Sequence, residues 1–121
     1  MLTNKYSVVN TLAKHEYVVK DEVNALCKDD LDSLKPWKWL TGSVINAYMR
    51  VLAAEVQRPG FEVFIMPTHF FSILSSGVTK RGLLSCNYSK VKHWLLTAHV
   101  LMRHIVVFPI NVNGNHWTVL V

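Results

Sequence analysis

The clearest pattern in the chain is an apolar repeat at helical spacing between residues 41 and 57. Apolar residues recur at this spacing and polar residues occupy the opposite face, which predicts an amphipathic helix. Thr41 is a suitable N-cap for this helix, and Arg58-Pro59-Gly60 ends it. The apolar stripe that we expect to face a core consists of Val44, Ile45, Tyr48, Met49, Leu52 and Val56.

Two further helices are predicted from residue 67 onward. A short one follows Pro67 and ends near Ser75-Ser76-Gly77. A longer amphipathic helix runs from Tyr88 to Ala98, with its lysines on the outer face. The segment between them, Val78 to Asn87, loses periodicity and predicts an exposed loop that contains Cys86.

The chain also contains segments with strand patterns. Val23 to Lys28 alternates as an edge strand would, and Phe61 to Met66 is a mostly apolar run. Ile105 to Ile110 is a nearly continuous apolar run, which is typical of a central strand buried on both faces. Asn113-Gly114 follows it between two apolar runs, the strongest short-range hairpin signal, so another strand should begin near His116.

The beginning of the chain has weaker patterns. Residues 1–22 lack a sustained period and are interpreted as an N-terminal extension with room for one short helix. Asp29-Asp30 predicts an N-cap followed by a short helical turn, which Pro36 closes. Trp37-Lys38-Trp39 is interpreted as extended, so one indole should pack inward while the other is exposed or binds a ligand.

The composition is that of one ordinary globular domain. The chain has 121 residues, enough for one core, and 50% of them are apolar while 17% are charged. The formal net charge is +5, but the basic residues are scattered and form no run longer than Lys80-Arg81. This distribution favours a solvated surface, and we expect no nucleic-acid partner.

Neither the cysteines nor the histidines are spaced as in a disulfide framework or a metal site. Cys27 and Cys86 lie far apart, without a CxxC motif. No histidine belongs to an HExxH motif or to a pair one helical turn apart with a supporting carboxylate, so we expect no metal and no cofactor. Phosphate loops and a Gly-x-Ser-x-Gly elbow are absent from the sequence. The histidines are His15, His69, His93, His99, His104 and His116.

The sequence carries no pattern typical of a membrane or secreted protein. The N-terminus has no uninterrupted apolar core of signal-peptide length, and no segment approaches ~18 consecutive apolar residues. The sparse cysteines agree with a reducing compartment. We therefore expect an intracellular protein, nuclear or cytoplasmic, with no membrane partner.

The candidate chemistry centres on His116 and on Trp117, which follows it directly. A histidine at the lip of a strand, with its neighbour on the opposite face, is well placed for acid–base work at a cleft. On the residues alone, a structural role is the more common outcome for a histidine at a strand end.

Two blocks of sequence, each weak alone, are jointly specific. The first runs from Trp39 to Tyr48 (Trp-Leu-x-x-x-x-Ile-Asn-x-Tyr), and the second runs from Pro109 to Trp117 (Pro-Ile followed by His-Trp). Thr68 to Leu74 and Tyr88 to Trp94 fall between them. Through these segments, roughly residues 25 to 121 resemble the ubiquitin-like protease family, the SUMO-specific (sentrin-specific) cysteine isopeptidases.

The resemblance implies an α+β fold, the N-terminal half of a papain-like cysteine protease domain with helices packed on the first strands of a central sheet. Residues 1–22 would be an N-terminal extension and residues 23–121 a truncated ubiquitin-like protease catalytic domain. The implied activity is cleavage after the Gly-Gly of a SUMO-like modifier, and the implied partners are that modifier and its conjugates. Half a sheet would leave an exposed apolar strand edge at Thr118 to Val121.

The resemblance also implies roles for individual residues. His116 matches the catalytic histidine that activates a cysteine thiolate. Trp39 and Trp117 match the two tryptophans that close over the modifier's Gly-Gly tail, because only glycine is thin enough to pass between two indoles. Phe70 or Phe71 would add an apolar contact to the modifier, with core packing as the alternative for both.

The chain departs from the family pattern at several positions. Gly42-Ser43 stands where the family usually carries an acidic residue, and His104 occupies another acidic position. The family's orienting Asp, oxyanion Gln and nucleophilic Cys follow the histidine, beyond Val121, whereas Cys27 and Cys86 precede it. We therefore expect this truncated chain to be inactive as a protease.

Two hypotheses from other classes stay open. One is a non-catalytic module that binds a SUMO-like modifier and regulates or competes. The other is a basic nucleic-acid-associated domain, which only the scattered positive charge supports.

Overall fold

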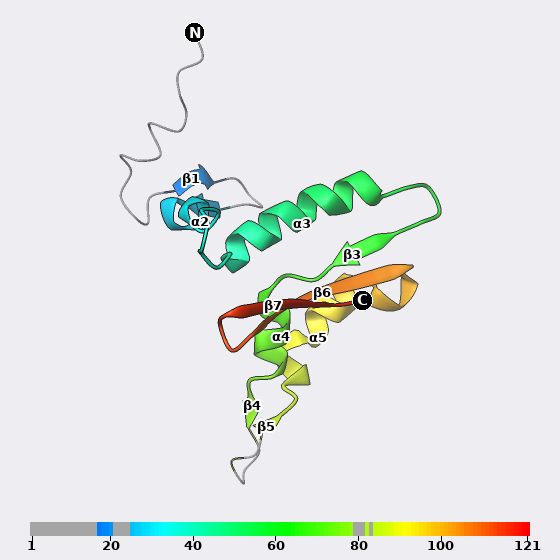
Figure 1. Cartoon of the computed structure of the whole chain (residues 1–121). Coiled ribbons are helices and arrows are strands. Elements are labelled where there is room, and N and C mark those ends of the chain that lie inside the picture. Colours follow the sequence, from blue (N-terminus) through cyan, green and yellow to red (C-terminus); the bar gives the residue numbers. More distant parts are fainter. Residues whose placement is uncertain (1–16, 21–24, 79–81, 83) are drawn as a thin grey trace. The chain divides into compact units, whose positions relative to one another are not determined.

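The computed structural model describes residues 17–20, 25–78, 82 and 84–121 (Figure 1). The chain divides into two compact units, Met1–Tyr48 and Met49–Val121. Most of the predicted N-terminal extension, including the place for a short helix, lies outside the described residues.

The first unit contains a small antiparallel sheet. Strand β1, Tyr17–Lys20, pairs with β2, Ala25–Cys27. The strand predicted for Val23 to Lys28 is confirmed over the residues of β2. We did not predict β1, because four residues are too few to establish a period of two against the mixed sequence around them.

Helix α2, Lys28–Asp32, is the predicted short helical turn, but its cap differs from the expectation. Cys27 is the N-cap, and its backbone N–H donates to Asp30 Oδ2 at 2.9 Å in a capping box. Asp30 therefore supports the helix from inside its first turn. The prediction of Asp29-Asp30 as the cap is wrong by two to three positions, because the reciprocal contact places Asp30 at N3.

Asp30 also binds the start of the next helix. Thr41 Oγ1 donates to Asp30 Oδ1 at 2.6 Å. Burial opposes ionisation of Asp30, but the hydrogen bonds from Thr41 and Cys27 outweigh it and hold the pKa of this carboxyl below its ordinary value. Two segments of the first unit are thus joined by one carboxylate.

The segment between α2 and α3 contradicts the extended interpretation of Trp37-Lys38-Trp39. Trp37 has φ of 64°, in the left-handed region, and therefore breaks the alternation of a strand. Both indoles are exposed, with relative accessible surface areas of 102% for Trp37 and 66% for Trp39. The prediction that one of them packs inward is wrong.

Helix α3, Gly42–Val56, has the predicted bounds and passes from the first unit into the second. Thr41 Oγ1 accepts the Val44 N–H at 3.4 Å, which agrees with its predicted place as the N-cap. The apolar stripe is not core, however, because no residue of α3 is buried. Tyr48 and Val56 are exposed, and the half-buried members are Val44, Ile45, Met49 and Leu52.

The second unit is built on a three-stranded sheet in the order β3-β6-β7. Strand β3, Val63–Ile65, runs parallel to β6, Ile105–Val112, and β7, His116–Leu120, runs antiparallel to β6. The central position predicted for β6 is confirmed. The prediction of burial on both faces is wrong, because Pro109 alone in β6 is buried and most of the strand is half-buried.

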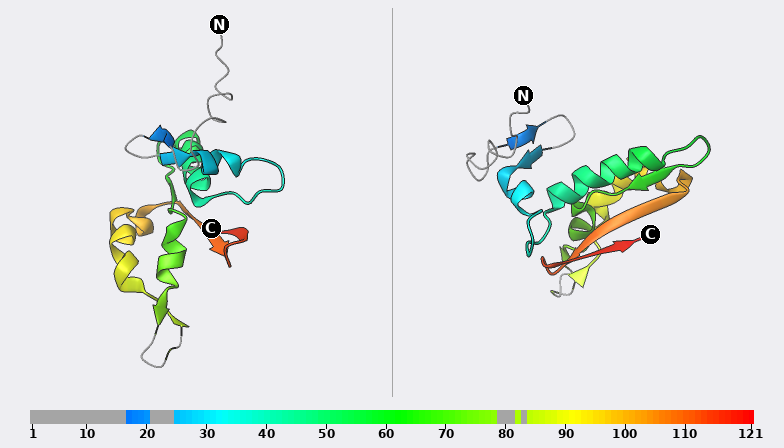
Figure 2. Two further views of the ribbon diagram at one scale, coloured as in Figure 1. Left: turned by 90° about the vertical axis from the view of Figure 1, so that its left-hand side faces the viewer. Right: turned by 45° about the horizontal axis from the view of Figure 1, so that its top comes forward.

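Helices α4, His69–Leu74, and α5, Tyr88–Thr97, lie beside this sheet (Figure 2). Both helices were predicted. They pack on the face of the sheet that carries Phe64, Val106 and Phe108. The buried centre of this core consists of Met66, Phe70, Val91 and Ala98.

The segment predicted as an exposed loop contains a short hairpin. Strand β4, Gly77–Val78, pairs antiparallel with β5, Leu84–Ser85. Strands of two residues carry no readable period, so the sequence could not predict them. Cys86 follows β5 outside any element and is exposed, as predicted. A 3-10 turn, η1, Val100–Met102, precedes β6.

Candidate functional site

The candidate site is the hairpin that joins β6 to β7. Val112 pairs with His116, and Asn113, Gly114 and Asn115 form the turn between them. Asn113 and Gly114 have φ of 55° and 78°, a left-handed conformation that asparagine and glycine adopt most readily. The predicted Asn-Gly hairpin is confirmed.

His116 is the first residue of β7, and its side chain is exposed. No described residue forms a hydrogen bond with its imidazole. Alternate residues of a strand share a face, so His116 lies on the same face as Leu120, which pairs with Phe108. Phe108 packs on Phe70 of α4 at a ring-centroid distance of 5.5 Å. His116 therefore lies at the hairpin end of the sheet face that α4 covers.

Trp117 lies on the opposite face and is half-buried. It pairs directly with Asn111 on β6. Asn111 Oδ1 is buried, and none of the described residues donates a hydrogen bond to it. Sequence reasoning did not single out Asn111, because an unpaired acceptor becomes visible only when the register and the burial are known.

The other predicted site residues differ in their accessibility. Trp39 lies in the first unit and exposes 66% of its surface. Phe70 is only 4% exposed and packs between Trp94 and Phe108, as the core alternative predicts. Phe71, at 38% exposure, is available for an apolar contact. The closing of Trp39 and Trp117 over a glycine tail stays a prediction.

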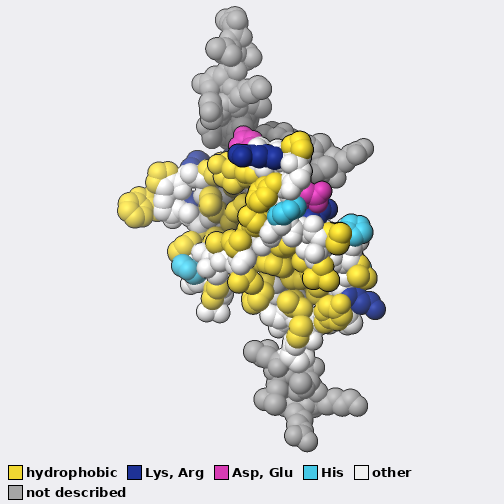
Figure 3. All heavy atoms as spheres, turned by 90° about the vertical axis from the view of Figure 1, so that its right-hand side faces the viewer, with side chains coloured by type: hydrophobic (Ala, Val, Ile, Leu, Met, Phe, Trp, Pro, Cys, Tyr) yellow, Lys and Arg dark blue, Asp and Glu magenta, His cyan; other side chains and the backbone are white. Residues whose placement is uncertain are grey.

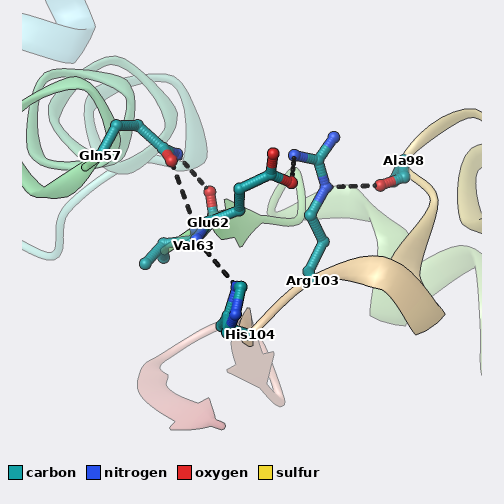
Figure 4. A network of polar contacts seen from close by, with 6 residues as sticks. All are labelled: Gln57, Glu62, Val63, Ala98, Arg103 and His104. Carbon is teal, nitrogen blue, oxygen red and sulfur yellow. Dashed lines mark hydrogen bonds and ion pairs between the residues drawn. The ribbon is translucent and has the colours of Figure 1, made fainter. Parts of the chain in front are cut away.

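A second polar cluster lies at the other end of β6, where a polar network joins it to β3 (Figure 4). His104 Nδ1 accepts the Glu62 N–H at 3.1 Å, and Arg103 forms an ion pair with Glu62 at 2.6 Å. Arg103 Nε also donates to the Ala98 carbonyl at 3.0 Å. A shallow cavity of about 460 Å³ opens here, lined by Gly60, Glu62, His99, Met102, Arg103 and His104.

This cavity is far from His116, since a strand of eight residues spans roughly 25 Å. Of its polar residues, Glu62, Arg103 and His104 are already paired within the network. Among the described residues no group of three His, Cys, Asp or Glu side chains could hold a metal ion. The cavity is therefore not part of the candidate site.

The two cysteines lie in other parts of the fold. Cys27 caps α2 in the first unit, and its Sγ donates to Asp30 Oδ2 at 3.2 Å. Cys86 follows the β4–β5 hairpin, which extends from the end of α4 away from the sheet (Figure 1). Neither cysteine belongs to the β6–β7 hairpin.

Comparison with known proteins assigns the chain to a family. A family model described as "Ulp1 protease family, C-terminal catalytic domain" matches residues 38–121, which include Trp39 and the His116-Trp117 pair. The chain belongs to the Ulp1 protease family. The resemblance to SUMO proteases seen in the sequence is thereby confirmed.

Family relatives include sentrin-specific protease 2 of Homo sapiens and of Pongo abelii. Each is 28% identical over 97 residues, which cover 79% of this chain and 15% of the relative. Ubiquitin-like-specific protease 1D of Arabidopsis thaliana is 25% identical over 100 residues, with 79% and 17% covered. The chain thus spans less than a fifth of the length of these relatives.

A solved structure titled as a de-sumoylating protease resembles this fold, with a TM-score of 0.59 and 22% identity over 79% of this chain and 36% of that one. This likeness concerns the fold, and it confirms the expectation of a partial papain-like α+β domain for this Ulp1-family chain. Within the described residues, no helix is long and apolar enough to cross a membrane.

Proposed function

We propose that this chain supplies the modifier-binding and proton-accepting part of a cysteine isopeptidase that cleaves after the Gly-Gly of a SUMO-like modifier. The observation that carries the proposal is the family match over residues 38–121, which includes Trp39, His116 and Trp117 together. The substrates are the modifier's conjugates and precursors, and the whole protein is a thiol hydrolase.

His116 acts as the general base in this proposal. Its exposed imidazole at the start of β7 is free to accept a proton from a cysteine thiol. The resulting thiolate attacks the carbonyl carbon of the modifier's last glycine, and the imidazolium then gives the proton to the departing lysine amine. A thioester remains, and water hydrolyses it.

The nucleophile of this reaction is neither cysteine of the chain. Cys27 occupies the cap of α2 and Cys86 an exposed segment after β5, and both lie outside the His116 hairpin. We therefore propose that these 121 residues bind the modifier without cleaving it. A SUMO probe with a thiol-reactive group at its C-terminus tests this, and a covalent adduct on Cys27 or Cys86 would falsify it.

Binding itself is tested by titrating SUMO that ends in Gly-Gly into the chain. Trp39→Ala and Trp117→Ala should each weaken binding about 30-fold, since a buried aromatic anchor contributes about 2 kcal/mol or more to an interface. Trp37→Ala is the matched control, because Trp37 is fully exposed and lies outside the matched residues. Equal losses for Trp37 and Trp39, or no binding by the unaltered chain, would contradict the proposal.

The non-catalytic binding module is the second candidate for the biological role of the chain. It is favoured if the whole protein also lacks the probe adduct while it binds SUMO through the same tryptophans. We further propose an intracellular location, nuclear or cytoplasmic, which the sparse cysteines support. Imaging of the tagged whole protein tests this location.

A further inference from the structure

The starting observation is the orphaned oxygen of Asn111. Its Oδ1 is buried, and no residue in the described part of the chain donates a hydrogen bond to it. Buried acceptors in native proteins are almost always paired, because desolvating an unpaired oxygen costs folding free energy. An acceptor kept in this condition is explained if a ligand supplies its donor.

The register places this oxygen beside Trp117. Asn111 and Trp117 are direct cross-strand partners, so their side chains lie on one face of the sheet with Cβ atoms about 5 Å apart. Asn111 as a whole is half-buried, and the terminal torsion of an asparagine side chain turns at little cost. Its carboxamide can therefore direct Oδ1 toward a molecule that rests on the indole.

The chemistry of an extended peptide fits this acceptor. A peptide that crosses the face of a sheet cannot join the hydrogen-bond ladder, which lies in the plane of the strands. Its backbone N–H groups need acceptors from side chains or water. Glycine leaves its N–H unshielded by a side chain, so a glycine lying on Trp117 presents a donor at the distance that Asn111 can reach.

We propose that Asn111 binds the Gly-Gly tail by accepting a hydrogen bond from a glycine backbone N–H, beside the Trp117 indole. This inference rests on the proposed function and adds a polar contact beside the Trp117 indole. The indole selects glycine because only a residue without a side chain is thin enough to lie against it. The hydrogen bond to Asn111 then fixes the position of the tail along this face of the sheet.

The test compares binding with stability in Asn111→Leu, which keeps the side-chain size and removes the acceptor. Titration with SUMO ending in Gly-Gly should show affinity reduced about tenfold, the effect of one lost hydrogen bond. The thermal unfolding midpoint of the same variant should stay equal to that of the unaltered chain or rise, because a buried unpaired oxygen has been removed. A purely structural asparagine would lower both quantities.

Three controls complete the experiment. Asn111→Asp keeps an acceptor oxygen and should retain affinity within about threefold of the unaltered chain. Glu55→Leu places a leucine at an exposed position of α3, outside the β6–β7 hairpin, and should leave affinity unchanged. SUMO lacking its Gly-Gly should bind the unaltered chain and Asn111→Leu equally, because the contact partner is gone.

The outcomes separate this inference from the proposed function. Tight binding by both the unaltered chain and Asn111→Leu overturns the Asn111 contact alone. A lower unfolding midpoint for Asn111→Leu with a parallel loss of affinity also overturns it, in favour of a structural role. No binding by the unaltered chain overturns the proposed function and the contact together.

Discussion

Polar residues at the two ends of strand β6 differ in their hydrogen bonding. At the start of the strand, His104 accepts the Glu62 N–H, and Arg103 holds both Glu62 and the Ala98 carbonyl. At the far end, the exposed His116 forms no hydrogen bond with the described residues, and Asn111 Oδ1 is buried without a donor. The polar groups at the start of β6 are therefore paired within the fold, whereas His116 and Asn111 Oδ1 at the far end have no hydrogen-bond partner among the described residues.

This difference shows what distinguishes a structural histidine from a candidate base. His104 and His116 both lie next to the ends of β6, and both are exposed. Pairing separates them, because His104 Nδ1 accepts a backbone N–H, whereas His116 forms no hydrogen bond with the described residues. Variants at either end of β6 test this difference in pairing.

The largest effect is expected from Gln57 at the network end. The Gln57 carboxamide pairs with both backbone groups of Val63, donating to its carbonyl at 2.6 Å and accepting its N–H at 3.4 Å (Figure 4). Val63 lies in the edge strand β3, so Gln57 takes the place of a neighbouring strand. Gln57→Leu should lower the free energy of unfolding by about 2 kcal/mol in urea titrations, because buried backbone groups lose their partners.

The control for this prediction is Glu55→Leu, an exposed position in the last turn of α3, two residues before Gln57. It should change the free energy of unfolding by less than about 0.5 kcal/mol. If Gln57→Leu changes the free energy of unfolding equally little, water satisfies the backbone groups of Val63, and the polar network at this end of β6 contributes less to stability than its contacts indicate.

A matched pair of histidine variants tests the comparison directly. His104→Ala should lower the free energy of unfolding by about 1 kcal/mol, because it removes the acceptor of the Glu62 N–H and a ring contact with Phe61 at 5.4 Å. His116→Ala should stay within about 0.5 kcal/mol. Urea titration of both variants gives the two values. Equal decreases in the free energy of unfolding would show that the two histidines do not differ in their structural role.

The remaining edge of the sheet also bears on this comparison. Val119, Leu120 and Val121 are 55%, 56% and 77% exposed, and β7 is an outer strand. Hydrophobic side chains likewise cover much of the molecular face shown in Figure 3. Thr118 to Val121, the residues expected at an exposed apolar edge, are exposed in this chain, whereas Gln57 pairs with Val63 at the edge of β3.

The sequence predicted those features that depend on local chemistry. Thr41 and Pro59 bound α3 because caps and prolines act within one turn. Asn113-Gly114 makes a hairpin because its backbone preferences match the turn. His116 and Trp117 were found because the family resemblance places a histidine and a tryptophan side by side.

Features that depend on three-dimensional context escaped prediction. The left-handed Trp37 has no local signal, since tryptophan rarely adopts that conformation. The exposure of the α3 stripe could not be read from its period, because periodicity identifies an apolar face without showing what covers it. Asn111 became a candidate only through the register with Trp117 and the burial of its oxygen.

The smallest predicted effect extends the comparison to the first unit, where Asp30 is a fully paired carboxylate. Its pKa is lowered in the folded chain, so the stability that it contributes is present above its unfolded pKa and is lost as pH falls through the folded pKa. Thr41→Val removes one donor and raises the folded pKa toward the ordinary value, so acid unfolding should begin at a higher pH. Thr41→Ser keeps the hydroxyl and should follow the unaltered chain. Circular dichroism during acid titration measures this shift, and identical curves for Thr41→Val and Thr41→Ser would show that Asp30 is not held by its partners.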